Sequence, residues 1–278
     1  GRHDVRLRQG HGAIVEDLTK RLAAHPRFSV VTDAAVTTVC YGRRPSVTVG
    51  GEEVACDFIV CALPLSALKR CTGGYEDGDG VSFRPELPWE KVMAVDAVGV
   101  GCVNKLILKF DWEFWRLEDR DVYFSYHGEP SGDSDDDDDN EEQEFDGSDS
   151  SELTCVRFCD VGKLLAAKED CSPPAVLEVC LWGRDAVRSE HLAEDELVER
   201  IETILSDLCQ VHVPSPIEVR RTTFGRDPHT LGTCSFLPPG ATEAEYAALA
   251  APCCGTGHAA RDAPLLRLFW AGEHTSVD

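Results

Sequence analysis

The tract Leu268–Thr275 places a carboxylate and a hydroxyl directly after a mostly apolar run. The run, residues 265–271, is typical of a buried strand. Gly272 then lets a backbone or a ligand come close, and Glu273 offers oxygen acceptors. Because open α/β sheets bind their ligands at the carboxyl ends of their strands, we expect Gly272, Glu273 and Thr275 to contact a polar ligand.

Lys105 is the second candidate for chemistry, since it lies within the apolar sequence Val103–Leu108. On a strand it shares a face with Val103 and Ile107, and the opposite face is apolar as well. We therefore expect the strand to be buried, which would lower the pKa of the lysine ammonium and favour a functional role. The alternative is an edge strand from which the lysine reaches solvent. The spacing alone leaves both open.

Apolar periodicity predicts the elements that position these residues. A continuous apolar run at 57–63 reads as a strand buried on both faces, as in a parallel sheet. Pro64 follows it and is suited to the first turn of a short helix. The predicted helices are 12–24, 65–69, 194–209 and 243–249, and the predicted strands are 35–41, 46–49, 57–63, 97–110, 175–182 and 265–271.

The negative charge is concentrated in one segment. The chain has 278 residues and a net charge of −23. Residues 131–152 contain twelve Asp or Glu and no Lys or Arg, so they carry about half of that excess. The segment is too poor in apolar groups to be ordered by burial, and we interpret it as a disordered acidic insert. The overall balance argues against direct binding of nucleic acid, which needs a basic surface.

Other function classes are disfavoured by motifs that are missing from the sequence. No apolar run is long enough to span a membrane. The thirteen cysteines show neither a C-x-x-C pair nor a Cys/His spacing that suits zinc. We predict no metal site and mostly reduced cysteines.

Several tracts, in order, resemble the FAD-dependent amine oxidase family. They are Ala35–Val36, Cys61–Leu65, Gly99–Trp115, Phe224–Pro228 with Gly232–Phe236, and Leu268–Thr275. The resemblance covers nearly the whole chain apart from the acidic insert. The lysine-specific histone demethylases are the nearest branch, and the polyamine oxidases come second.

The resemblance implies a role for each candidate residue. Lys105 matches the lysine that holds a water against the flavin, which makes it the catalytic candidate. Glu273 matches the glutamate that contacts FAD near its ribityl and pyrophosphate parts. The other implied FAD contacts are Val36, Leu63, Pro64, Gly272 and Thr275, and the implied substrate pocket is Phe224, His229, Cys234 and Phe236.

The sequence departs from the family pattern in two respects, the aromatic residues of the substrate pocket and the glycine-rich fingerprint. The family often has tryptophan at Phe224, a second aromatic at His229 and tyrosine at Cys234, where the aromatic side chains cage the substrate amine. The glycine-rich G-x-G-x-x-G fingerprint, which binds pyrophosphate at a helix N-terminus, is absent. We therefore expect a piece of a flavoenzyme that lacks the amino half of its flavin domain and, alone, binds FAD weakly or not at all and is inactive.

The implied function is oxidation of a substrate amine by hydride transfer to FAD, with peroxide as a product. The implied substrate is methyl-lysine on a basic, histone-like tail, and the implied location is nuclear. The alternatives are a polyamine oxidase, a cytoplasmic location, and a non-catalytic scaffold that has lost flavin binding.

The expected fold class is α/β, with part of a Rossmann-like FAD-binding domain and a mixed-sheet substrate domain. We assign residues 1–70 and 251–278 to the FAD-binding domain. Residues 71–250, including the insert, are assigned to the substrate domain.

Overall fold

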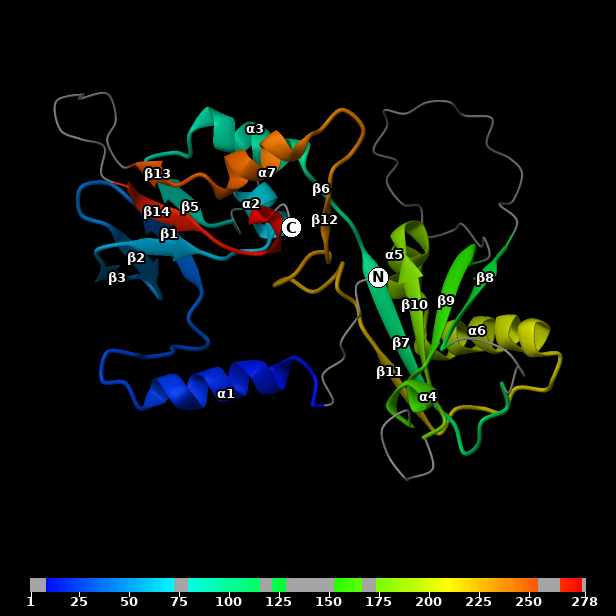
Figure 1. The fold of residues 1–278 in the computed structure, drawn as a ribbon. Coiled ribbons are helices and arrows are strands. Elements are labelled where there is room, and N and C mark those ends of the chain that lie inside the picture. Colours follow the sequence, from blue (N-terminus) through cyan, green and yellow to red (C-terminus); the bar gives the residue numbers. More distant parts are fainter. Residues whose placement is uncertain are drawn as a thin grey trace.

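The chain folds into two lobes joined by extended segments (Figure 1). The structure is a computed structural model that describes residues 9–72, 80–115, 122–128, 153–166, 174–254 and 266–276. The acidic insert 131–152 lies outside the described residues.

The first lobe combines two small sheets with three helices. One sheet has the strand order β3-β2-β1-β5, and the other has the order β13-β14-β4, in which β14 and β4 run parallel. The strands are β1 (Val36–Cys40), β2 (Ser46–Val49), β3 (Glu52–Ala55), β4 (Ile59–Cys61), β5 (Ser82–Arg84), β13 (Cys253–Cys254) and β14 (Leu266–Trp270). The helices are α2 (Leu65–Thr72), α3 (Trp89–Ala97) and α7 (Glu243–Ala250), and a 3-10 turn η1 (Glu273–Thr275) follows β14.

Lys91 joins the helices of this lobe from inside its core. Lys91 as a whole is only 3% exposed. The ammonium donates to the carbonyl oxygens of Ala248, Leu249 and Ala251 at 2.7, 2.6 and 2.8 Å. It also lies 4.6 Å from the centroid of the Trp270 ring. Burial lowers the pKa of Lys91 to about 8. Because a cation suits the carbonyl end of a helix, this side chain fixes the end of α7 against the last strand.

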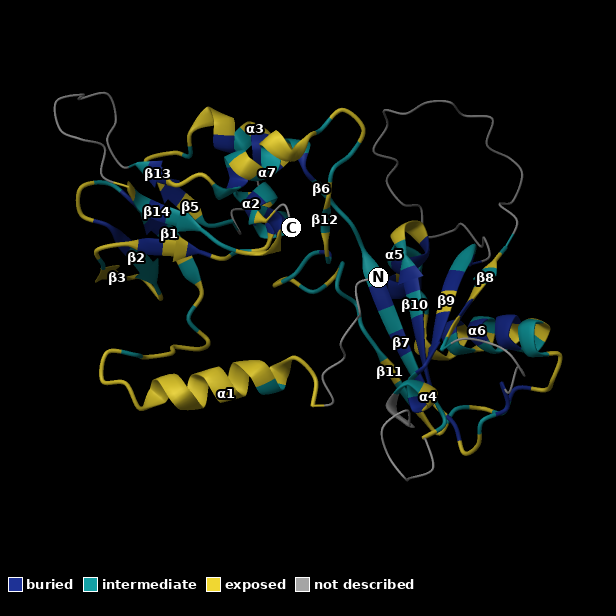
Figure 2. Ribbon diagram, in the orientation of Figure 1, coloured by how far each residue is buried: buried dark blue, intermediate teal, exposed yellow. Residues whose placement is uncertain are grey.

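The second lobe is an antiparallel sheet covered on one face by helices (Figure 2). Its strand order is β11-β7-β10-β9-β8. The strands are β7 (Val103–Lys109), β8 (Tyr123–His127), β9 (Cys155–Asp160), β10 (Val176–Trp182) and β11 (Glu218–Arg221), and the helices are α4 (Val161–Ala166), α5 (Gly183–His191) and α6 (Glu194–Cys209). Leu106, Leu108, Leu197, Ile201 and Leu205 are fully buried in the core between sheet and helices.

The expectation that the Lys105 strand is buried on both faces is wrong. Leu106 and Leu108 of β7 are buried at 0% exposure, whereas Lys105 and Ile107 on the other face are only half-buried. The 57–63 run departs from expectation in the same way, because Val60 of β4 is 66% exposed. Its pairing with β14 is parallel, however, which agrees with the predicted parallel sheet.

A short two-stranded ladder connects the lobes. The predicted strand 97–110 is divided into β6 (Gly99–Val100) and β7, and Ala97 belongs to α3. β6 pairs with β12 (Ser235–Phe236) before the chain continues into the second lobe. Residues near Val100 and residues near Ser235 are therefore held side by side at the junction.

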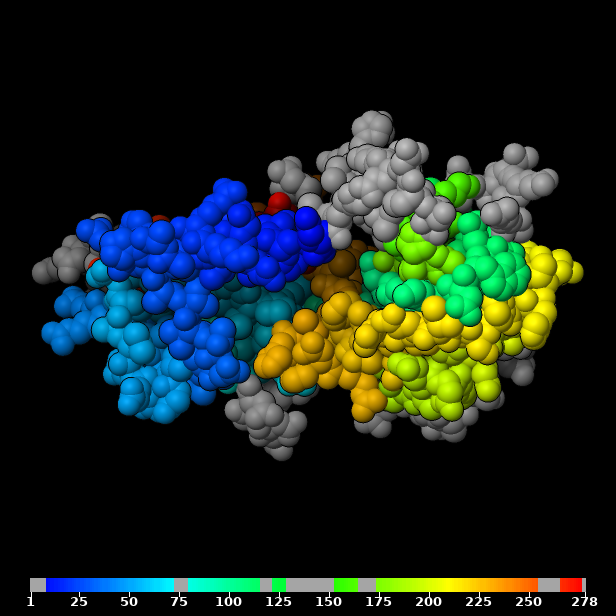
Figure 3. All heavy atoms as spheres, turned by 90° about the horizontal axis from the view of Figure 1, so that it is seen from below, coloured from blue at the N-terminus to red at the C-terminus, as the bar shows by residue number. Residues whose placement is uncertain are grey.

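Helix α1 (Gly12–Ala23) forms as predicted, but none of its residues is buried. Its apolar residues Ile14, Val15, Leu18 and Leu22 are 44–64% exposed. The helix forms an outer ridge along the first lobe (Figure 3). Apolar stripes of this kind mark surfaces where another segment packs.

The fold class is α/β with mixed sheets, as expected. The domain boundaries at 70 and 250 stay a prediction. The core of the first lobe also includes Phe83, Val95 and Leu249, so both hydrophobic cores use residues from 71–250.

Candidate active site

A cavity of about 160 Å³ lies at the carboxyl ends of the parallel strands β4 and β14. Three segments from distant parts of the sequence enclose it. The carboxyl ends of parallel strands are the position where α/β sheets bind ligands. Its lining residues are Ala62, Leu63, Pro64, Leu65, Ser66, Val100, Thr233, Cys234, Ser235, Gly272, Glu273 and His274.

The first wall is the turn from β4 into α2. The first main-chain bond of this helix runs from the Leu68 amide to the Pro64 carbonyl, so the earlier amides of the turn have no partner within the helix. A helix N-terminus with free amides attracts anions such as phosphate. The Ser66 hydroxyl donates to the Thr230 carbonyl and ties this turn to the chain that leads into Thr233.

The second wall is the turn Gly272–His274 after β14. Gly272 has a φ of 125°, and a Cβ there would lie 3.1 Å from the His274 ring. Both constraints select glycine. The Glu273 carboxylate accepts hydrogen bonds from the Ser235 hydroxyl at 2.8 Å and from the Ser235 amide at 3.2 Å. The carboxylate is thus fixed at the edge of the cavity.

The third wall is the segment Thr233–Ser235 packed on Val100. The Gly101 amide donates to the Cys234 carbonyl at 2.8 Å, and the Thr233 amide donates to the Gly101 carbonyl at 2.9 Å. Gly232 has a φ of 134°, and a Cβ there would lie 2.5 Å from the Val100 side chain. A larger residue at 232 would therefore separate this wall from β6.

His274 is the most buried polar side chain at the cavity, with 3% exposure. Its Nε2 atom is buried and has no hydrogen-bond partner among the described residues. Burial lowers the pKa of the imidazole below its ordinary value of 6.5, the carboxylate of Glu273 opposes this shift, and Lys91 adds to it. The ring is thus held in its neutral form near neutral pH.

We expect the stability of the protein to fall as the pH drops below about 6.5 through the protonation of His274. The unfolded chain takes up the proton at a higher pH than the folded chain, so the stabilisation is complete above the unfolded pKa and is lost as the pH falls through the folded pKa. Urea midpoints at pH 7.5 and 5.5 measure it. The His274→Gln variant should lose less stability over this interval, and an equal loss in both proteins would contradict the assignment.

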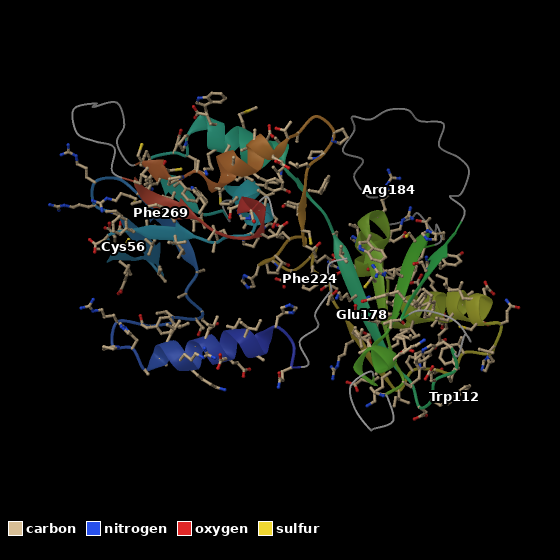
Figure 4. All side chains as sticks on the ribbon, in the orientation of Figure 1. Cys56, Trp112, Glu178, Arg184, Phe224 and Phe269 are labelled. Carbon is tan, nitrogen blue, oxygen red and sulfur yellow. The ribbon has the colours of Figure 1, made fainter. Side chains whose placement is uncertain are left out.

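Lys105 is not part of the cavity lining. It lies five residues from Val100, at most about 17 Å along an extended chain. Its ammonium is 3.3 Å from the Glu178 carboxylate on β10, and its side chain is 42% exposed, whereas that of Glu178 is 10% exposed. Figure 4 shows Glu178 on the sheet of the second lobe, beyond Phe224 at the junction.

The cavity gathers part of the predicted site. Leu63, Pro64, Cys234, Gly272 and Glu273 line it, and Cys234 is exposed there. The remaining candidates lie outside this lining: Val36 in β1, Thr275 in η1, Phe224 and His229 in the turn after β11, Phe236 in β12, and Lys105.

Several lining residues were not assigned a role from the sequence. Ser235 holds Glu273, and Val100 and Thr233 form the wall. Their signal is visible in the sequence only as neighbours of Gly99 and Gly232. An added Cβ at Gly99 would overlap the Phe236 ring, and one at Gly232 would lie 2.5 Å from the Val100 side chain.

The described residues contain no group of three His, Cys, Asp or Glu side chains that would hold a metal ion. Every cysteine that the structure describes is a free thiol. Within the same residues, no helix has the length and apolar character needed to cross a membrane.

The residues at the cavity suit part of a dinucleotide. A helix N-terminus on one side matches a phosphate, and a carboxylate on the other side accepts hydrogen bonds from hydroxyl groups. The volume of about 160 Å³ is below the roughly 300–1,000 Å³ of pockets for larger ligands. The described cavity therefore holds only a portion of such a cofactor.

A nucleotide-type cavity at the strand ends of an α/β lobe, beside a second lobe built on an antiparallel sheet, fits the architecture of a two-domain flavoenzyme. The chain belongs to the flavin containing amine oxidoreductase family, whose match covers residues 1–278. FAD is the cofactor of this class.

Among curated relatives, the chain is 27% identical over 286 residues to the possible lysine-specific histone demethylase 1 of Drosophila melanogaster. It is 26% identical over 271 residues to the protein FLOWERING LOCUS D of Arabidopsis thaliana. The alignments cover 98% and 96% of this chain but only 28% of each relative.

Solved structures share the fold at low identity. A putrescine oxidase variant matches with a TM-score of 0.63 and 16% identity, over 96% of this chain and 48% of that chain. Cyclohexylamine oxidase from Brevibacterium oxydans matches with a TM-score of 0.56 and 16% identity, over 87% of this chain and 43% of that chain.

Proposed function

We propose that this chain forms part of a FAD-dependent amine oxidase that acts on methyl-lysine in a basic, histone-like tail. The observation that carries the proposal is the cavity in which the β4–α2 turn, the Glu273 carboxylate and the Thr233–Ser235 segment converge. FAD held there would supply the two-electron oxidation of the carbon–nitrogen bond by hydride transfer, with dioxygen as the final acceptor that becomes hydrogen peroxide. Water would hydrolyse the resulting imine to formaldehyde and the demethylated amine.

The residues of this chain have distinct parts in that function. The N-terminal amides of α2 would hold an anionic group of the cofactor, and Glu273 would accept hydrogen bonds from its hydroxyl groups. Lys105, paired with Glu178 at 3.3 Å, would handle a proton next to the reacting amine or flavin. Phe224 would contribute an apolar wall that favours the neutral amine and excludes water.

Two observations support methyl-lysine as the substrate. Curated relatives bear the name lysine-specific histone demethylase, and the chain carries a net charge of −23. A strongly negative protein attracts a basic partner over long range. A histone-like partner implies that the protein acts in the nucleus.

The full-length protein, loaded with FAD, tests the proposal. We expect peroxide and formaldehyde to be released in equal amounts from a dimethyl-lysine peptide of basic sequence, and none from the unmethylated peptide. Oxidation of putrescine or spermine alone would replace the proposed substrate with a polyamine. A protein without flavin absorbance and without amine turnover would overturn the enzyme assignment in favour of a scaffold.

A further inference from the structure

A buried carboxylate outside the cavity connects α5 to the turn that carries Phe224. Glu190 of α5 is 4% exposed. Its Oε1 atom accepts hydrogen bonds from the Asn104 amide group at 2.6 Å and from the Gly225 main-chain amide at 2.7 Å. Bonds to an ionised acceptor are stronger than those between neutral groups, so this contact fixes the turn firmly.

The main chain around Glu190 makes a second set of bonds to the same segment. The Arg226 guanidinium donates to the Glu190 carbonyl at 3.1 Å. The Arg221 guanidinium donates to the carbonyls of Ser189 and Leu192 at 3.2 and 2.9 Å. Because these carbonyls lie at the end of α5, two cations from residues 221–226 hold the helix end in place.

Asn104 extends the network to the strand that carries Lys105. Its side-chain oxygen accepts from the Phe224 amide at 3.0 Å and from the Thr222 hydroxyl at 3.1 Å. The Lys105 amide donates to that hydroxyl at 2.8 Å, and the Thr222 amide donates to the Lys105 carbonyl at 2.9 Å. One hydrogen-bond network therefore fixes the position of the Lys105 main chain and of the Phe224 turn.

Gly225 is closely fitted to this carboxylate. A Cβ at Gly225 would lie 2.9 Å from Glu190 Oε2 and 3.3 Å from Cys102 Sγ. The turn and the carboxylate therefore have little freedom to shift independently.

We propose that Glu190 is a positioning residue of the amine-oxidising site, which holds the turn 222–226 and its Phe224 wall at a fixed distance from Lys105. The proposal rests on the proposed function. Glu190 does not line the cavity, so its effect reaches the substrate through Asn104 and Gly225.

The Glu190→Gln variant of the FAD-loaded full-length protein tests this role. We expect the KM for the methylated peptide to rise about fivefold with a smaller change in kcat, because a displaced wall weakens amine binding. Hydrogen–deuterium exchange over residues 222–227 should become faster, and the flavin absorbance should stay unchanged. Glu190→Ala should enlarge both effects.

Asp185→Asn is the matched control. Asp185 lies in the same helix and is 2% exposed. Its carboxylate accepts hydrogen bonds from the amides of Thr154 and Cys155 at 2.9 and 2.8 Å. These two residues lie at the start of β9, far along the chain from the Phe224 turn. We expect Asp185→Asn to lower stability while KM and exchange at 222–227 stay at wild-type values.

Equal effects of Glu190→Gln and Asp185→Asn would reduce Glu190 to a general structural role and overturn the proposal. Unchanged KM and exchange in Glu190→Gln would overturn it as well. If the wild-type protein oxidises no amine, the proposed function fails. The exchange comparison then decides alone: selective loosening of 222–227 in Glu190→Gln supports the positioning role, and its absence overturns it.

Discussion

Lys105→Met is expected to slow amine oxidation by about a hundredfold, the lower range for loss of a positioned proton-transfer group. Methionine keeps the length and the apolar stem of the side chain but removes the ammonium that lies 3.3 Å from Glu178. The FAD content should stay unchanged, since Lys105 does not line the cavity. Peroxide release by the FAD-loaded full-length protein measures the rate, and the visible absorbance measures the flavin content.

Lys109→Met is the matched control for this prediction. Lys109 lies on the same strand and face, its side chain is 49% exposed against 42% for Lys105, and it is also paired with a carboxylate, Glu218, at 3.8 Å. Its removal should leave the rate at the wild-type value. A wild-type rate in Lys105→Met, or an equal loss in Lys109→Met, would remove Lys105 from the mechanism.

The sequence pattern around Lys105 could not predict how far its strand is buried. Apolar residues on both faces of a strand predicted burial, yet only the face with Leu106 and Leu108 is covered by helices. The other face of β7 is half-buried and holds the Lys105–Glu178 pair. Strand periodicity shows which residues share a face, but not whether a second layer covers that face.

Helices with a strong apolar stripe could be predicted from the sequence alone. Helix α6 has the predicted bounds, because Leu197, Ile201, Ile204 and Leu205 recur at helical spacing and are buried. Helix α5 was not predicted, since its sequence GRDAVRSEH contains few apolar residues. Asn104 instead donates to the Ala186 carbonyl within the helix, and Arg221 and Arg226 donate to carbonyls at its end. These stabilising contacts come from distant parts of the chain.

The candidate site was predictable where a motif lies at the end of a strand. Leu63, Pro64, Gly272 and Glu273 follow β4 and β14, and the parallel pairing of these strands brings them together. The contribution of Ser235 depends on the pairing of β12 with β6. A two-residue ladder between segments more than a hundred residues apart leaves no periodic signal.

Glu273→Ala is expected to weaken FAD binding by about tenfold or more, since a hydrogen bond to a charged group contributes roughly 1.5–3 kcal/mol. The carboxylate lines the cavity, and its bonds to Ser235 keep it at the edge. Glu273→Gln retains an oxygen acceptor without the charge and should give a smaller loss. Titration of the flavin-free full-length protein with FAD, monitored by the quenching of flavin fluorescence, gives the Kd.

Glu243→Ala provides the comparison for this change of charge. Glu243 is an exposed residue of the first turn of α7 and does not line the cavity. The Glu243→Ala substitution should leave the Kd for FAD unchanged. A general effect of net charge would instead shift the Kd of Glu243→Ala and Glu273→Ala equally. An unchanged Kd in Glu273→Ala would mean that the carboxylate holds only Ser235, and the cofactor would then have to be bound elsewhere than at the ends of β4 and β14.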